Sequence, residues 1–385
     1  MLCCSGFTRA RKAKFAVSCY FFSMGSALGA WAGVLPQVKK DHGLNNSILG
    51  ATLVAAVFGA IAALPLVTYF SQKFGSGFSL FLGGLILLLL YPIVGIKSHL
   101  AVFVLGVFGL GFGCGWADVS MNAQAVVCEK MTRSSTLGLF HSIMAIGGLL
   151  GALFAGFLIE QNYSVLQVTI FLSLLLLFPQ LFLSWWLYTI QEEKLIDQNC
   201  FIHNDMEYEK IDTEVNPLNT ALFPAEADVP PEQDEPDAPF DWQEYKSPSS
   251  DQINYSILYS IAFLCFLSYF GQGSIGDWSA IYLSNELEAN AFECTFGFVG
   301  FELFVAIGTY YSDWFVMRFG RKILLQASGI VAAIGLALAV GAMSLKSHES
   351  SLILAVVGFS LSGLGMSVVT SSSRFCFCPA LKAFL

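Results

Sequence analysis

The 385-residue chain has little charge, since only 12% of its residues are Asp, Glu, Lys or Arg, about half the share of a soluble domain. It has only five histidines, and it lacks a phosphate-binding loop, a GxSxG serine and an HExxH zinc motif. Its ten cysteines are scattered, without CxxC pairs or nearby histidine ligands. These absences argue against a soluble enzyme, and we expect no catalytic residues, no metal site and no cofactor.

Apolar residues dominate instead, at 55% of the chain with a mean hydropathy of +0.65. A bilayer core needs about 20 apolar residues in one helix, and a helix satisfies its own backbone hydrogen bonds in lipid. Ten runs meet this requirement: 15–35, 48–70, 78–97, 101–126, 138–159, 165–190, 254–273, 292–312, 323–344 and 350–370. We therefore predict an all-α integral membrane protein with six plus four spans. The length of the first run favours an uncleaved span over a signal peptide.

The net charge of −9 hides an uneven distribution. Residues 191–253 hold 17 of the 28 acids and only three lysines, which leaves the rest of the chain mildly basic. The same segment holds seven of the twelve prolines, so we predict a disordered loop. It is either a plain linker or a regulatory segment that docks a cytoplasmic protein. The balance of charge favours no nucleic-acid partner.

Lys and Arg are distributed unequally between the two sides of the predicted spans. With the N-terminus inside, 15 of the 19 basic residues fall on the inner side, as the positive-inside rule requires. The basic N-terminus (1–14) and the central loop are therefore expected in the cytoplasm, with the chain spanning the plasma membrane or a bacterial inner membrane. The remaining parts are a six-helix bundle (15–190), a four-helix bundle (254–370) and an atypical tail (371–385).

The loops that contain Gly75 and Gly320 have similar amino-acid sequences. Aligning Gly320 with Gly75 places Arg318 on Lys73, an offset of 245 residues. A parallel repeat of this kind is a known transporter architecture, in which two bundles of similar build surround one site. The repeat therefore predicts two related bundles.

The second of these loops reads Asp-x4-Arg-x-Gly-Arg-Lys from residue 313, which resembles the loop motif of the major facilitator superfamily. Three further strings resemble its YbjJ-like branch near the fucose permeases: GWADVSMNAQ (115–124), HSIMAIGGLLGAL (141–153) and DWSAIYL (277–283). The resemblance implies an inner gate formed by Lys73, Gly75, Asp313, Arg318, Gly320, Arg321 and Lys322.

The resemblance also implies a function and a length. Members have two bundles that rock around a central site, and they move small solutes by alternating access. We expect a secondary active transporter of a small polar, sugar-like solute, coupled to protons. The family has twelve spans, so the chain is expected to be truncated after the tenth. The alternatives are a membrane sensor or scaffold that transports nothing, and an inactive truncated transporter.

Ionisable groups inside a span are costly and usually face a cavity or a partner. Asp118 and Glu302 are the carboxylates of this kind, and either is a candidate proton carrier. The full candidate set for the substrate or proton pathway is Trp31, Asp118, Asn122, Gln124, His141, Gln272, Asp277, Trp278 and Glu302. Trp31 enters by its position in the family, and Asn122 shares a helix face with Asp118.

Structural roles remain open for several of these residues. Asp118 and Gln124 are also suited to fixing helix packing through hydrogen bonds, and His141 is also suited to the membrane interface. Trp278 is typical of the lipid interface without a ligand. Gly147, Gly151 and Ala155 recur every four residues and predict a close helix–helix contact.

Overall fold

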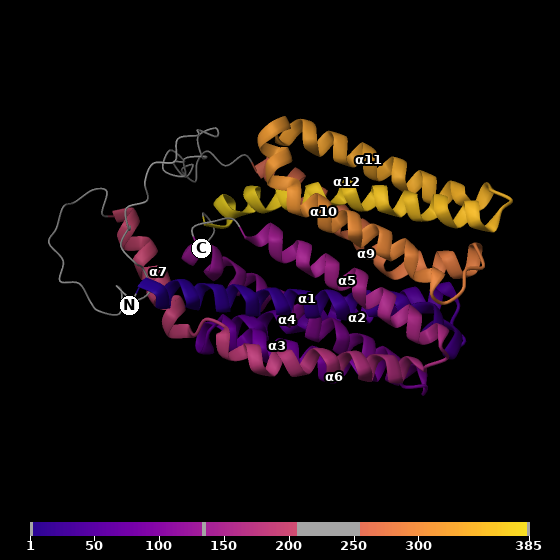
Figure 1. Ribbon diagram of the computed structural model, residues 1–385, viewed down its shortest axis with the longest axis horizontal. Coiled ribbons are helices and arrows are strands. Elements are labelled where there is room, and N and C mark those ends of the chain that lie inside the picture. Colours follow the sequence, from indigo (N-terminus) through magenta and orange to yellow (C-terminus); the bar gives the residue numbers. More distant parts are fainter. Residues whose placement is uncertain (1–2, 133–135, 206–254, 383–385) are drawn as a thin grey trace.

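A computed structural model describes residues 3–132, 136–205 and 255–382, and the regular structure in these ranges is entirely helical (Figure 1). The α-helices are α1 (Cys3–Asp41), α2 (Asn46–Phe74), α3 (Ser76–Leu90), α4 (Leu100–Thr132), α5 (Leu137–Glu160), α6 (Val165–Leu183), α7 (Ile190–Asp205), α9 (Tyr255–Glu286), α10 (Phe296–Phe319), α11 (Arg321–Gly341) and α12 (His348–Lys382). Short 3₁₀ turns are η1 (Tyr91–Gly95), η2 (Ser184–Trp186), η4 (Glu293–Thr295) and η5 (Ala342–Ser344).

The ten apolar runs all coincide with helices, which confirms the all-α fold. Among the described residues, nine helices are long and apolar enough to cross a membrane. The remaining predicted span, 254–273, coincides with α9. Figure 1 shows the long helices running side by side, with α7 and the N-terminus at one end. We call this end the α7 end and the other the opposite end.

Local signals set where these helices begin. The Asn45 side chain accepts a hydrogen bond from the backbone N–H of Ile48 at the start of α2, over 2.8 Å. Gly75 separates α2 from α3 with φ +89°, and Gly320 separates α10 from α11 with φ +76°. Positive φ is readily available only to glycine. The two glycines aligned in the sequence repeat therefore make the same turn in both halves.

Close glycine contacts hold α1 against α5. A Cβ on Gly147 would collide with the backbone carbonyl of Phe22, and one on Gly151 would collide with that of Ser26. On the facing helix, Gly29 lies equally close to the backbone of α5. Small residues let two helix backbones approach closely, which is the main source of helix association in lipid. Ala155 continues this face and is fully buried.

Two groups of helices, α1–α6 and α9–α12, have separate apolar cores. They meet mainly through α1 with α9 and through α5 with α10. Phe298 of α10 packs with Ala32 of α1 and Ala152 of α5, in one cluster shared by both groups. Ile281 of α9 is likewise buried within the core of the first group. These joining residues lie toward the opposite end.

The prediction of a disordered segment starting at residue 191 is wrong for its first part. Residues 190–205 form α7, because Thr189 and Glu192 begin it with reciprocal bonds. Thr189 N–H donates to the Glu192 carboxylate over 2.8 Å, and Glu192 N–H donates to the Thr189 hydroxyl over 3.4 Å. This capping box stabilises a helix start that composition alone does not reveal. The rest of the predicted loop, 206–253, lies outside the described residues.

Candidate functional site

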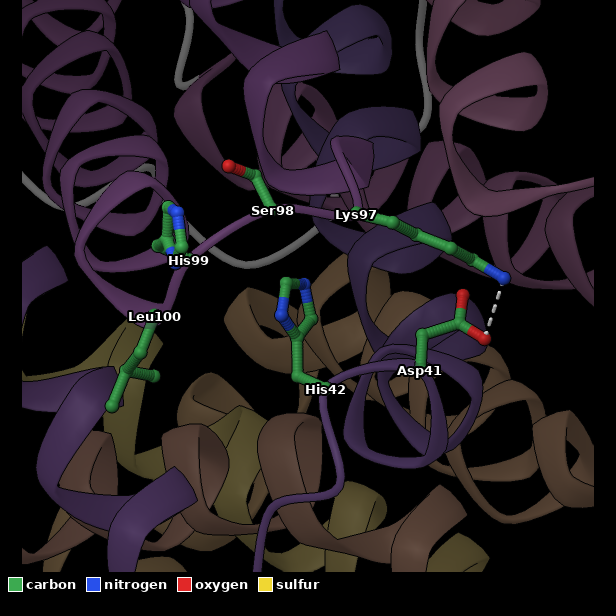
Figure 2. Close-up of a pocket in the computed structure, with 6 residues that line it drawn as sticks. All are labelled: Asp41, His42, Lys97, Ser98, His99 and Leu100. Carbon is green, nitrogen blue, oxygen red and sulfur yellow. Dashed lines mark ion pairs between the residues drawn. The ribbon is translucent and has the colours of Figure 1, made fainter.

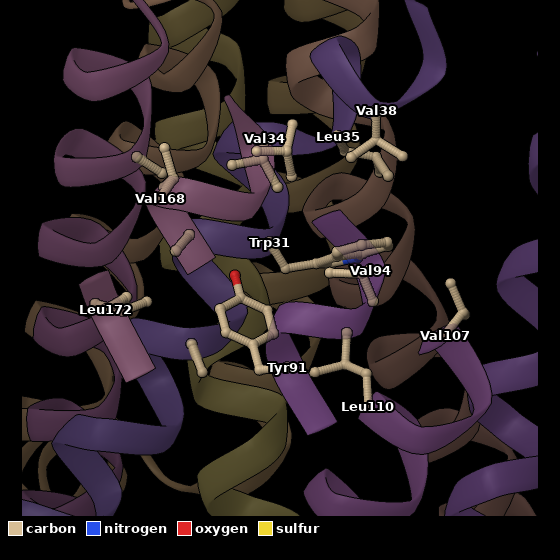
Figure 3. Close-up of a cluster of buried hydrophobic side chains, with 14 of the residues drawn as sticks. Trp31, Val34, Leu35, Val38, Tyr91, Val94, Val107, Leu110, Val168 and Leu172 are labelled. Carbon is tan, nitrogen blue, oxygen red and sulfur yellow. The ribbon is translucent and has the colours of Figure 1, made fainter. Parts of the chain in front are cut away.

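Trp31 and Asp277 meet where the two groups of helices join. The indole Nε1 of Trp31 on α1 donates a hydrogen bond to Asp277 Oδ1 on α9, over 3.2 Å. Trp31 is 6% exposed and belongs to a core cluster with Val34 and Leu35 (Figure 3). Trp278 follows Asp277 and lies against Gly50 of α2. The structure thus joins two sequence candidates from separate segments, Trp31 and Asp277, and places a third, Trp278, against α2.

Asp118, Asn122 and His141 form a second polar group on α4 and α5. The Asn122 amide donates to the Asp118 backbone carbonyl over 2.9 Å and to the Asp118 carboxylate over 3.1 Å. His141 Nε2 lies 3.3 Å from Asn122 Oδ1, and its ring meets Phe21 of α1 edge-on at 5.2 Å. All three polar side chains are half-buried. They offer donors and acceptors to a polar molecule within the membrane-spanning region.

Glu302 lies in the first half of α10. It faces α5, because a Cβ added to Gly148 would lie 3.3 Å from the Glu302 carboxyl carbon. Its side chain is half-buried. Gln272 on α9 is also half-buried and donates to the Ser268 hydroxyl over 3.3 Å. Glu302 therefore lies at the contact between the two groups of helices.

The Gln124 amide, one of the candidates in the predicted pathway set, is occupied within a buried network at the α7 end. Its Nε2 donates to Ser76 Oγ and to Glu193 Oε1, each over 2.8 Å. Its Oε1 accepts from the backbone N–H of Tyr188 over 3.0 Å. Gln124 is 0% exposed. It joins α4 to α3 and α7, so its geometry is that of a packing residue.

The sequence analysis missed Glu193, a residue of α7 whose carboxylate lies at the N-terminus of α3. Its carboxylate accepts from the Ser76 N–H over 3.0 Å, the Ser76 hydroxyl over 2.7 Å and the Gly77 N–H over 3.3 Å. A helix start carries unpaired N–H groups and partial positive charge, so a carboxylate is favourable there. The acidic composition of residues 191–253 favours a loop at this position, so no sequence signal points to the contact.

Arg9 and Glu192 form an ion pair beside this network. Arg9 Nε and Nη2 each donate to the Glu192 carboxylate over 2.9 Å, and Nη2 also donates to the Leu187 carbonyl over 2.8 Å. Partial burial alone would raise the pKa of Glu192. Hydrogen bonds from Arg9 and Thr189, with the charge of Arg9, outweigh burial and hold this pKa below its usual value. The N-terminal turns of α1 are thereby tied to α7.

The predicted inner gate is only partly described. Lys73 donates to the Tyr69 hydroxyl over 3.0 Å and lies 5.3 Å from the centre of that ring. Arg318 is exposed at the end of α10. Three further side chains lie outside the described residues, namely Asp313, Arg321 and Lys322. The pairing of this gate therefore stays a prediction.

A pocket of about 450 Å³ lies at the opposite end, where α1 ends and α4 begins (Figure 2). It is lined by Asp41, His42, Lys97, Ser98, His99 and Leu100. Lys97 Nζ and Asp41 Oδ1 form an ion pair of 2.9 Å across it, and the His42 ring stacks on Phe103 at 4.8 Å. The pocket lies at the ends of the first group's helices, and none of the predicted pathway residues lines it.

Comparison with known proteins decides the family. The sequence profile described as Major Facilitator Superfamily matches residues 16–376. The chain belongs to this superfamily. It is therefore a multi-pass membrane transporter of small solutes and not an enzyme.

Relatives in the superfamily agree with this assignment. An uncharacterized MFS-type transporter of Yersinia pestis is 26% identical over 352 residues, which cover 91% of this chain and 76% of that protein. A structure of the xylose transporter XylE from E. coli, partially occluded and inward open, has a TM-score of 0.62 at 14% identity. It covers 98% of this chain and 87% of XylE. A D-xylose-proton symporter has a TM-score of 0.59 at 13% identity, covering 97% and 88%. These two structural likenesses support the superfamily fold.

Proposed function

We propose that this superfamily member moves a small polar, sugar-like solute by alternating access in symport with protons. We further propose that it belongs to the YbjJ-like branch near the fucose permeases, on the strings quoted above from its fourth, fifth and seventh spans. The α7 end then faces the cytoplasm, in agreement with the excess of Lys and Arg on that side. The opposite end faces the exterior.

The observation that carries this proposal is the position of polar side chains at the junction of the two groups of helices. Trp31 and Asp277 join α1 to α9, and Glu302 of α10 faces Gly148 of α5. Polar groups inside the hydrocarbon region persist where they serve a cavity, a partner or a transported species. Alternating access places the solute site between two such groups of helices.

Proton coupling needs a carboxylate that can gain and lose a proton during the cycle. Asp118 and Glu302 are the intramembrane candidates, and both are half-buried. His141 lies beside Asn122, which links it to Asp118. We propose that Glu302 or Asp118 carries the proton. A structural neighbour known as a D-xylose-proton symporter supports both coupling and pentoses as a first class of solute to test.

Counterflow in proteoliposomes tests transport without requiring a proton gradient. Vesicles loaded with one unlabelled solute from a panel of pentoses, hexoses and polyols are diluted into a trace of the labelled form. We expect label to accumulate transiently for at least one solute. The enantiomer of that solute, such as L-xylose beside D-xylose, is the matched control, because leakage through the bilayer does not distinguish enantiomers.

Counterflow that is equal for both enantiomers, or equal to that of protein-free vesicles for every solute in the panel, would contradict sugar-like transport. With a solute in hand, gradient-driven accumulation is measured in Asp118→Asn and Glu302→Gln. We expect at least one substitution to abolish accumulation, because an amide side chain does not ionise at neutral pH and so carries no proton through the cycle. Unchanged accumulation in both variants would overturn the coupling proposal.

A further inference from the structure

The two groups of helices are held together at the opposite end mainly by apolar contacts. Phe298 packs on Ala32 and Ala152. Thr295 of η4 presents its methyl group to Gly33 and Gly156. Apolar contacts have little directional preference. They can close the junction, but they do not by themselves determine when it opens.

The hydrogen bond between Trp31 and Asp277 differs from these contacts. It joins α1 to α9 directly, and both residues lie in the half of their helix nearer the opposite end. An indole N–H is a donor only and a carboxylate accepts strongly, so the bond has one direction and one geometry. Because Trp31 is only 6% exposed, separating the partners would leave its N–H without an equally good acceptor inside the closed protein.

The residues around Trp31, the donor, restrain its side chain more than the residues around Asp277 restrain the accepting carboxylate. Trp31 is 6% exposed in the apolar cluster of Figure 3, and its ring stacks near Phe103 at 6.5 Å. Asp277 is half-buried, and its neighbour Gly276 lies beside the Phe298 ring. Phe298 is one helical turn from Glu302. The acceptor thus lies on α9 of the second group, and Phe298 beside its neighbour belongs to the same helix as Glu302.

We propose that Trp31 and Asp277 are the gating pair of the opposite end, a latch whose hydrogen bond holds this side closed and must break before it opens. The proposal rests on the proposed alternating-access function. It assigns to these two residues a role in the conformational step rather than in solute binding. Opening exchanges hydrogen-bond partners only. The indole N–H leaves the carboxylate, and water or the solute then forms a hydrogen bond with each of the two groups.

Thiol accessibility tests the latch directly. Gly148→Cys places a thiol beside Glu302, because the three atoms nearest to an added Cβ all belong to that flexible side chain, at 3.3–3.6 Å. Its reaction with a membrane-impermeant charged methanethiosulfonate is measured from each side, in right-side-out and inside-out vesicles. The signal from native cysteines is subtracted with the parent protein that retains Gly148.

We expect Trp31→Phe to raise the reaction rate from the opposite end about tenfold, since one hydrogen bond worth about 1.4 kcal/mol shifts an equilibrium tenfold. Asp277→Leu should have the same effect, and combining the two should add nothing further because both remove one contact. Asp277→Asn keeps an acceptor oxygen and should stay within about threefold of the parent. Trp185→Phe, at a tryptophan that is 86% exposed, should leave the rate within about twofold.

The outcomes separate the two proposals. An equal rate in Trp31→Phe and Trp185→Phe, with the thiol still reached from the α7 end, would overturn the latch while leaving transport intact. Additive effects of Trp31→Phe and Asp277→Leu would also overturn it, because the residues would then act independently. A thiol that reacts from neither side in any variant would contradict a water-accessible pathway, and with it the transport proposal.

Discussion

Removing the Glu193 carboxylate should destabilise the helix packing at the α7 end. The structure allows the loss in the free energy of unfolding to be estimated. The Ser76 N–H, in a residue only 5% exposed, would lose its acceptor, and a buried unsatisfied donor costs about 1–3 kcal/mol. The lost charge at the start of α3 adds about 0.3–1 kcal/mol. Gln124 keeps its bonds to Ser76 and Tyr188, which limits the damage. We therefore expect Glu193→Ala to lower the free energy of unfolding by about 2 kcal/mol.

The assay is a denaturant titration of the detergent-solubilised protein, followed by circular dichroism. Glu193→Gln should lose about 1 kcal/mol, because it keeps an acceptor oxygen but not the charge. Gln191→Ala is the matched control, since Gln191 is exposed on the same helix and surface changes usually stay within about 0.5 kcal/mol. If Glu193→Ala and Gln191→Ala unfold at the same denaturant concentration, the carboxylate does not stabilise this end.

Two further predictions concern the same half of the chain. The pKa of Glu192 is held below its usual value, so its pairing with Arg9 stabilises the fold fully above about pH 4.3 and less as pH falls through the lowered pKa. The stability difference between wild type and Glu192→Gln should therefore shrink between pH 6 and pH 3, and a constant difference would contradict the pairing. Gly147→Val should prevent α1 from packing on α5, because its side chain meets the Phe22 carbonyl, with folded yield in detergent falling at least tenfold. Gly273→Ala, where nothing lies within 4 Å, is the control and should leave the yield unchanged.

The helices were predictable because a chain that spans lipid has few backbone conformations that satisfy its hydrogen bonds. Each run of about 20 apolar residues must satisfy its own backbone, and this forces a helix whatever its neighbours are. The glycine turns at Gly75 and Gly320 were visible as a repeat for a similar reason, since positive φ restricts the residue type. The start of α7 was missed because it depends on the side-chain exchange between Thr189 and Glu192. Acidic composition downstream of it obscured that short signal.

The candidate site was predictable as a set of residues but not as a set of contacts. Intramembrane carboxylates such as Glu302 stand out in a sequence because they are costly in lipid. The partner of each depends on how distant segments pack: Trp31 and Asp277 are 246 positions apart, and no local pattern links them. For Gln124 the difficulty is the opposite. A polar side chain inside a span gives the same sequence pattern whether it binds a solute or joins two helices.

The measurement that tests the account most directly compares two modes of transport in one variant. In sealed proteoliposomes with an interior pH dye, wild type should take up protons together with a counterflow-competent solute. Glu302→Gln should keep counterflow and lose solute-driven proton uptake if Glu302 is the proton carrier, and Asp118→Asn should do so if Asp118 is. Proton uptake that persists in both variants at the wild-type rate would contradict coupling through the intramembrane carboxylates.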